Sequence, residues 1–126
     1  MIGSSMAAEF DRLPSKIKQL AEDLLFDESV RFCAIGGLFQ PDFIILTTQR
    51  LLVLTEQIIG NLMYTTNRCN LEFEQIIQID INRTLWQKFT NQACLKIETG
   101  GVVHFVKGLS LGDAKQIITL VLASRP

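Results

Sequence analysis

The chain has 126 residues, of which 48% are hydrophobic and 20% are charged, and its formal net charge is −1. This length and composition fit one globular domain with one core. The balanced charge provides no overall basic field that would attract nucleic acid or an anionic membrane. No apolar run approaches the ~20 residues that a membrane-spanning helix requires.

Residues 1–13 are expected to form a flexible leader in front of a single domain over residues 14–126. The start, MIGSSM, is short and polar, and it lacks the basic and apolar regions of a signal peptide. Its first residues are expected to derive from cloning, with Met6 as the native start.

The first regular element is predicted to be an amphipathic helix that begins near Pro14, because proline suits the first turn of a helix. Its apolar face consists of residues three and four positions apart, namely Ile17, Leu20, Ala21, Leu24 and Leu25. Alternating apolar residues over 30–35 predict the first strand, and glycine and proline mark a loop over 36–42.

The stretch FIILTTQRLLVLTE, residues 43–56, determines the fold class. As one helix it would be apolar on every side and rich in β-branched residues, which helices disfavour. As one strand it would exceed the usual strand length. Two antiparallel strands joined by a tight turn at Thr48, Gln49 and Arg50 fit best.

The chain that follows alternates between apolar and polar residues in short runs. Residues 57–67 are interpreted as a longer, irregular connection. Further short strands are predicted around residues 71–73, 77–81, 95–98 and 103–105. Gly100 and Gly101 supply a two-residue hairpin turn between the last two strands.

The last element is predicted to be a second amphipathic helix. Ser110 and Asp113 have the form of a capping box at its start. The apolar residues behind them repeat at helix-face spacing: Ala114, Ile117, Ile118, Val121 and Leu122. The chain is therefore predicted to be mainly β, an α+β domain of about seven short antiparallel strands. An extra helix precedes the strands, and the C-terminal helix covers one end of the curled sheet.

This order of elements and several motifs resemble the pleckstrin-homology (PH) domains of bacteria. The run ILTTQRLLVL, residues 45–54, is similar to the LT-x-x-RL-hydrophobic signature of bacterial PH-like domains and to the corresponding part of GRAM domains. LEFEQIIQID, residues 71–80, resembles their next signature, and LKIETGGVVHF followed by GDAKQIITLVL completes the pattern. The resemblance covers residues 29–122 and implies a PH-like barrel capped by its C-terminal helix.

The resemblance implies a non-catalytic interaction module, since small stand-alone bacterial members of the family tend to form ring-like homo-oligomers. We expect protein–protein contacts, foremost with further copies of the chain. The alternative is a membrane-surface adaptor that binds anionic lipid head groups. PH domains that bind phosphoinositides carry basic residues in the loop between the first two strands. The loop over 36–42 has one acidic and no basic residue, so lipid binding is disfavoured.

Two surface positions are candidate contacts. Arg50 is a candidate anion contact, with the alternative that it is a solvated turn residue whose stem packs over apolar neighbours. The cluster LWQKF contains the candidate interface residues Trp86, Lys88 and Phe89, near the expected tip of a hairpin. Such aromatic residues can contact a protein partner, dip into a membrane interface, or fold back onto the sheet.

No catalytic, metal or cofactor site is predicted. The single histidine is His104, and Cys33, Cys69 and Cys94 have no CxxC spacing. An odd number of unpaired cysteines indicates reduced thiols of a cytoplasmic protein, and we expect them to be inert core residues. An enzyme or carrier that uses the barrel interior is the least favoured class, because small barrels are filled by their own side chains. No nucleic-acid partner is expected, since the one aromatic cluster has few basic neighbours.

Overall fold

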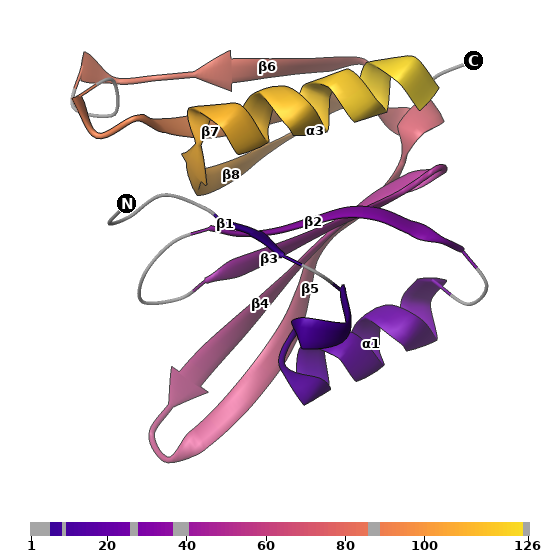
Figure 1. Cartoon of the computed structure of the whole chain (residues 1–126), viewed down its shortest axis with the longest axis vertical. Helices are drawn as coiled ribbons and strands as arrows, with labels where there is room; N and C mark the ends of the chain where they lie inside the picture. The colour runs from indigo at the N-terminus through magenta and orange to yellow at the C-terminus, as the bar shows by residue number, and fades with distance from the viewer. Residues whose placement is uncertain (1–5, 9, 26–27, 37–40, 86–88, 125–126) are drawn as a thin grey trace.

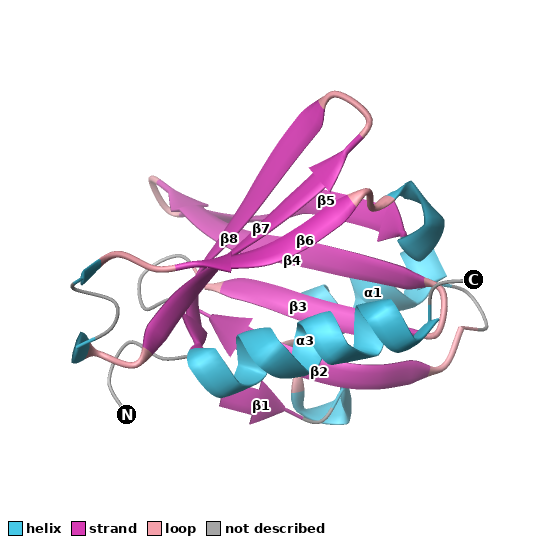
Figure 2. Ribbon diagram, turned by 90° about the horizontal axis from the view of Figure 1, so that it is seen from above, coloured by secondary structure: helices cyan, strands magenta, loops and turns pink. Residues whose placement is uncertain are grey.

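A computed structural model describes residues 6–8, 10–25, 28–36, 41–85 and 89–124, with the backbone alone described at 6–8, 57–59 and 63. The elements in chain order are β1 (Met6–Ala8), the 3₁₀ helix η1 (Phe10–Arg12), α1 (Ser15–Leu25), β2 (Val30–Gly36), β3 (Asp42–Thr47), β4 (Arg50–Ile59), β5 (Leu62–Glu72), the 3₁₀ helix η2 (Phe73–Gln75), β6 (Gln78–Asn82), β7 (Gln92–Thr99), β8 (Val102–Ser110) and α3 (Leu111–Ser124). The strands form a first sheet in the order β1-β2-β3-β4-β5 and a second sheet in the order β6-β7-β8 (Figures 1 and 2).

Strand β3 is buried on both faces, which explains the unbroken apolar run in this part of the sequence. Ile44 and Leu46 pack into a core that the two sheets and α3 share. Phe43 and Ile45 point the other way and pack into a second core with α1. Because successive strand residues face opposite sides, one apolar strand serves both cores. The predicted pair of strands is confirmed, with Leu46 of β3 opposite Leu51 of β4.

Helices α1 and α3 pack against different sheets. Helix α1 lies against the first sheet, and α3 runs along the second sheet on the other side of the molecule (Figure 1). In α3 the buried positions are Ala114, Ile117 and Val121, whereas Leu122, which was predicted on the same face, is 53% exposed because it lies at the border of that face. The Ser110 hydroxyl accepts a hydrogen bond of 3.1 Å from the Asp113 N–H, so the predicted cap is present at the start of this helix.

The prediction of an irregular connection over residues 57–67 is wrong. Strands β4 and β5 continue through this segment and pair up to Ile59 and Leu62, around a turn at Gly60 and Asn61. Gly60 has a φ of 63°, which a two-residue hairpin turn needs. Past Thr55 the two strands pair only with each other among the described strands, because β3 ends at that level. They project from the sheet as a two-stranded ribbon (Figure 1). Their residues therefore do not alternate between apolar and polar in the way that those of a half-buried strand do.

The leader also differs from the expectation in its second half. Residues 6–8 form strand β1 and pair with β2, with Ala7 opposite Ala34. Leu13 is buried in the core against α1. The segment therefore belongs to the fold from residue 6 onward, because it extends the first sheet and adds apolar contacts under α1. The seven strands that were predicted correspond to β2–β8, and β1 is an addition to them.

The two sheets meet at the corner between the end of β2 and the second half of β8. A side-chain carbon added at Gly36 would lie 3.2 Å from the Lys107 carbonyl oxygen and 3.3 Å from that of Gly108. Gly108 itself has a φ of 79° and lies where two residues of β8 stand opposite one of β7. This bulge turns β8 toward β2, so the two sheets together form a barrel-like structure.

Candidate interaction surface

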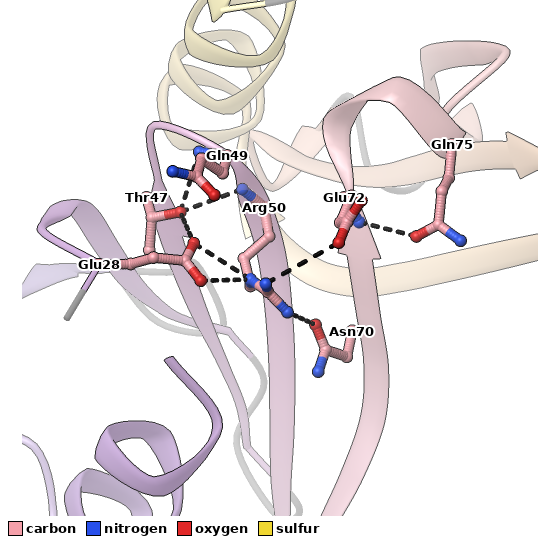
Figure 3. Close-up of polar contacts among 7 residues, drawn as sticks. All are labelled: Glu28, Thr47, Gln49, Arg50, Asn70, Glu72 and Gln75. Carbon is pink, nitrogen blue, oxygen red and sulfur yellow. Dashed lines mark hydrogen bonds and ion pairs between the residues drawn. The ribbon is translucent and has the colours of Figure 1, made fainter. Parts of the chain in front are cut away.

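Arg50 opens strand β4, and its guanidinium binds groups of the same chain (Figure 3). Its Nε lies 2.8 Å from one carboxylate oxygen of Glu28, and its Nη1 donates to Asn70 Oδ1 at 3.1 Å. Its Nη2 lies 4.0 Å from the Glu72 carboxylate. The side chains of Arg50 and Glu28 are only 20% and 14% exposed. An external anion at this position would therefore have to compete with Glu28.

The same network holds the turn between β3 and β4. The Thr47 hydroxyl donates to Glu28 at 2.8 Å and accepts the backbone N–H groups of Gln49 and Arg50, each at 3.0 Å. Glu28 follows α1 closely, and its N–H donates to the Leu25 carbonyl at 3.0 Å. The cluster thus ties the segment behind α1 to the first sheet. The anion contact that the sequence suggests for Arg50 stays a prediction.

The aromatic cluster lies in the connection between β6 and β7. Trp86 and Lys88 are outside the described residues, whereas the flanking Leu85 and Phe89 are 75% and 81% exposed. The base of the connection is closed by Arg83, whose Nε donates to the Gln92 carbonyl at 2.9 Å. Phe89 is therefore not folded back onto a sheet, and two large apolar side chains face water at this end of the molecule.

A second group of polar residues lies at a pocket between the first sheet and β8, which we call the mouth pocket. It has a volume of about 470 Å³ and is lined by Asp42, Val53, Arg68, Cys69 and residues 103–107. The buried Asp42 accepts a hydrogen bond from the Thr55 hydroxyl. Its other oxygen lies 2.7 Å from Arg68 Nη1. Arg68 Nη2 in turn donates to the Phe105 carbonyl on β8 at 3.0 Å, so this side chain bridges the two sheets.

Arg68 reaches this position because β5 contains a bulge there. Val53 of β4 pairs with Cys69, and the next residue, Leu54, pairs with Asn67. Arg68 is left without a partner in the ladder, and a bulge of this kind redirects a side chain. Sequence reasoning missed the Asp42–Arg68 pair: it read Asp42 as a loop residue, and no local signal pairs it with a residue 26 positions away.

The cysteines are buried free thiols in the described structure. Burial raises the pKa of Cys33 to about 12 and that of Cys69 to about 11. Burial also raises the pKa of Cys94, against a smaller opposing effect of Lys107. His104 and Cys69 both line the mouth pocket. However, a thiol with such a pKa stays protonated at neutral pH, and the thiolate is the nucleophilic form.

Two further features of the described residues concern metal ions and membranes. They contain no group of three or more histidine, cysteine, aspartate or glutamate side chains placed to hold a metal ion. No helix among them is long and apolar enough to cross a membrane.

No protein-family model matches the chain, and no curated protein matches it. Among solved structures, the chain is similar to the crystal structure of a DUF1696 family protein with a pleckstrin-homology domain from Shewanella loihica PV-4, determined at 2.00 Å resolution. The TM-score is 0.68 with 14% sequence identity, over 96% of this chain and 97% of that chain. At this identity the likeness shows the fold, and the chain therefore has a PH-like fold, mainly β with a C-terminal helix. The likeness to GRAM domains stays a prediction.

Proposed function

We propose that this chain is a non-catalytic PH-like interaction module that acts through protein–protein contacts and associates with further copies of itself. The observation that carries the proposal is the exposure of Leu85 and Phe89 on either side of residues 86–88. Large apolar side chains in water favour burial against a partner. Trp86 and Lys88 belong to the same proposed contact, since they lie between these two residues in the chain.

A ring-like homo-oligomer is the assembly that we propose. In a ring, the connection between β6 and β7 of one copy meets a different surface of the next copy. Every interface then uses the same apolar residues, so one substitution weakens all of them together.

Two features support a binding role over a catalytic one. The thiols have raised pKa values and are held in the unreactive form. The core between the two sheets is packed with the chain's own side chains, among them Ile44, Leu95 and Ile117, each with no exposed surface, and the mouth pocket lies at its rim. A small barrel filled in this way leaves little interior room for a substrate.

The test is the solution mass of the full chain by light scattering. We expect an oligomer for the unchanged chain and a lower mass for the double variant Leu85→Ala with Phe89→Ala, with the same circular dichroism spectrum. Truncation of an aromatic at the centre of an interface commonly costs about 2 kcal/mol or more, which is about a thirtyfold loss of affinity per contact.

Leu122→Ala is the matched control, because Leu122 is also an exposed leucine but lies on α3. It should leave the mass unchanged. A monomeric mass for the unchanged chain would refute self-association. An unchanged oligomer in the double variant would place the contact on another surface.

A further inference from the structure

The edge of β8 beside the mouth pocket carries backbone groups that no neighbouring strand occupies in the described part of the chain. Among the described strands, β8 pairs with β7 alone. The Phe105 carbonyl accepts its hydrogen bond from Arg68, so it points away from β7. In an antiparallel ladder, the groups of alternate residues point to the same side. The N–H and C=O of Val103 and the N–H of Phe105 therefore also point away from β7.

The hairpin turn supports this direction independently. Thr99 and Val102 flank the two-residue turn at Gly100 and Gly101. The pair that closes such a turn is hydrogen-bonded across the hairpin, and hydrogen-bonded and open pairs alternate from there. Val103 is the next residue of β8 after this pair, so its backbone groups are not bonded to β7. The Phe105 carbonyl, two residues further on, points away from β7 in the same way.

Space and apolar surface accompany these groups. The mouth pocket of about 470 Å³ runs along residues 103–107 of β8. The side chains of Val103 and Phe105 are 46% and 40% exposed. An added strand would thus find backbone partners on one side and apolar side chains to cover on the sheet surface.

The charge of the pocket selects among the segments that could bind there. Its lining contains the cationic residues Arg68 and Lys107, and Asp42 is its only acidic residue in the described structure. Asp42 already binds Arg68 and the Thr55 hydroxyl. Lys107 is exposed and forms no ion pair with another described residue. An acidic side chain from outside would supply the missing negative charge.

We propose that an extended segment of a partner protein, with acidic residues between apolar ones, adds to β8 as a fourth strand of the second sheet. Its backbone binds the open groups of Val103 and Phe105, and an acidic side chain reaches Lys107. Main-chain bonds supply the affinity in this mode, and the alternating side chains supply the specificity. This contact is separate from the proposed self-association at Leu85 and Phe89 and does not depend on it.

The probe is a library of random heptapeptides displayed on phage and selected on the full chain. We expect the enriched sequences to alternate apolar and acidic residues. A labelled synthetic copy should bind saturably in fluorescence polarisation. Lys107→Glu should weaken it about tenfold, because an exposed attraction becomes a repulsion. Lys115→Glu makes the same charge change on an exposed residue of α3 and should leave the affinity unchanged.

Amide hydrogen exchange of the unchanged chain provides a test without any substitution. The peptide should slow exchange at Val103 and Phe105 and leave exchange in α1 as it was. Equal affinity for the two lysine variants, enriched peptides without acidic residues, unchanged exchange on β8, or no enrichment at all would each overturn the proposal.

The same variants and the same peptide distinguish two other possible occupants of this edge, a lipid surface and a second copy of the chain. Suppose that phosphatidylserine vesicles bind the unchanged chain, that Lys107→Glu abolishes this binding, and that the peptide does not bind. The face then contacts lipid and the proposal fails. If the peptide lowers the solution mass, the edge of β8 joins copies of this chain and the proposal fails as well. The variant Leu85→Ala with Phe89→Ala should bind the peptide normally, so the two proposals can fail separately.

Discussion

The contact between Glu28 and Arg50 shows how one ion pair can hold an element in place. Both side chains are largely buried, and Thr47 adds a hydrogen bond to the same carboxylate. A partly buried charge that loses its partner has no full compensation from water. Loss of this pair should therefore lower the free energy of unfolding more than loss of an ion pair on the surface does.

We expect Glu28→Ala to lower the free energy of unfolding by about 1–3 kcal/mol, because it leaves the Arg50 guanidinium without its main partner. Urea denaturation measures this change. Lys18→Ala removes an exposed ion pair with Asp11 and should cost at most about 1 kcal/mol. Equal effects of the two variants would contradict a stabilising role for the Glu28–Arg50 pair.

The buried thiols predict a loss of stability in alkaline solution. Burial raises the pKa of Cys33 from 9.0 to about 12, so the folded chain keeps a proton that the unfolded chain releases above pH 9.0. The unfolded state then binds fewer protons, and the free energy of unfolding falls as pH rises through this window. The slope from one such thiol is about 1.4 kcal/mol per pH unit.

Chemical denaturation at several pH values within this window measures the slope. Cys33→Ala should be less steep than the unchanged chain, whatever its stability at neutral pH. An equally steep profile for the variant would show that other groups cause the alkaline loss.

Among the elements, helix α3 stabilises the domain mainly through the face that packs against the core. Ile117 has no exposed surface and packs in the core that the two sheets share. We expect Ile117→Asp to unfold the domain, since an unpaired buried charge costs several kcal/mol. Leu122→Asp places the same charge on an exposed position of α3 and should leave the circular dichroism spectrum intact. A stable Ile117→Asp variant would mean that α3 is not docked.

The strands show which elements a sequence reveals and which it obscures. Strand β6 has one half-buried face, and alternation predicts it. The paired segments of β4 and β5 beyond Thr55 form a ribbon without a third strand among those described. Neither side of a ribbon needs to be uniformly apolar or polar, so periodicity carries no signal there. The turn at Gly60 and Asn61 was the available clue, since glycine and asparagine favour two-residue hairpins.

At the scale of the whole molecule, the charge distribution opposes the membrane-adaptor alternative. The net charge is −1, and the segment over residues 36–42 contains no basic residue that could bind an anionic head group. We expect no saturable binding to phosphoinositide vesicles in sedimentation at physiological salt. Any attraction at low salt should fade as the screening length shortens to ~8 Å.

Vesicles of phosphatidylcholine alone provide the baseline for this measurement. Head-group-selective and saturable binding at physiological salt would favour the membrane adaptor over the protein-contact module. The outcome is independent of the solution mass, so it tests a different part of the proposed function.

The elements that could be predicted from the sequence are those whose signals are local. Residues a few positions apart predict each of these elements. They are the two amphipathic helices, the cap at Ser110, the turn at Gly100 and Gly101, and the paired strands of residues 43–55. Their order is enough to predict the PH-like plan, which the solved structure of similar fold confirms. Local chemistry decides these features because each is stabilised within one element or between adjacent ones.

The contacts that join distant segments could not be predicted in this way and became apparent in the folded chain. The bridge from Asp42 through Arg68 to Phe105 depends on a bulge in β5 and on how the two sheets meet. The Glu28–Arg50 pair depends on where α1 ends over the first sheet. The open edge of β8 exists because no further described strand pairs there. A ladder's register and the packing of sheets are properties of the whole core, so no short pattern of residues encodes them.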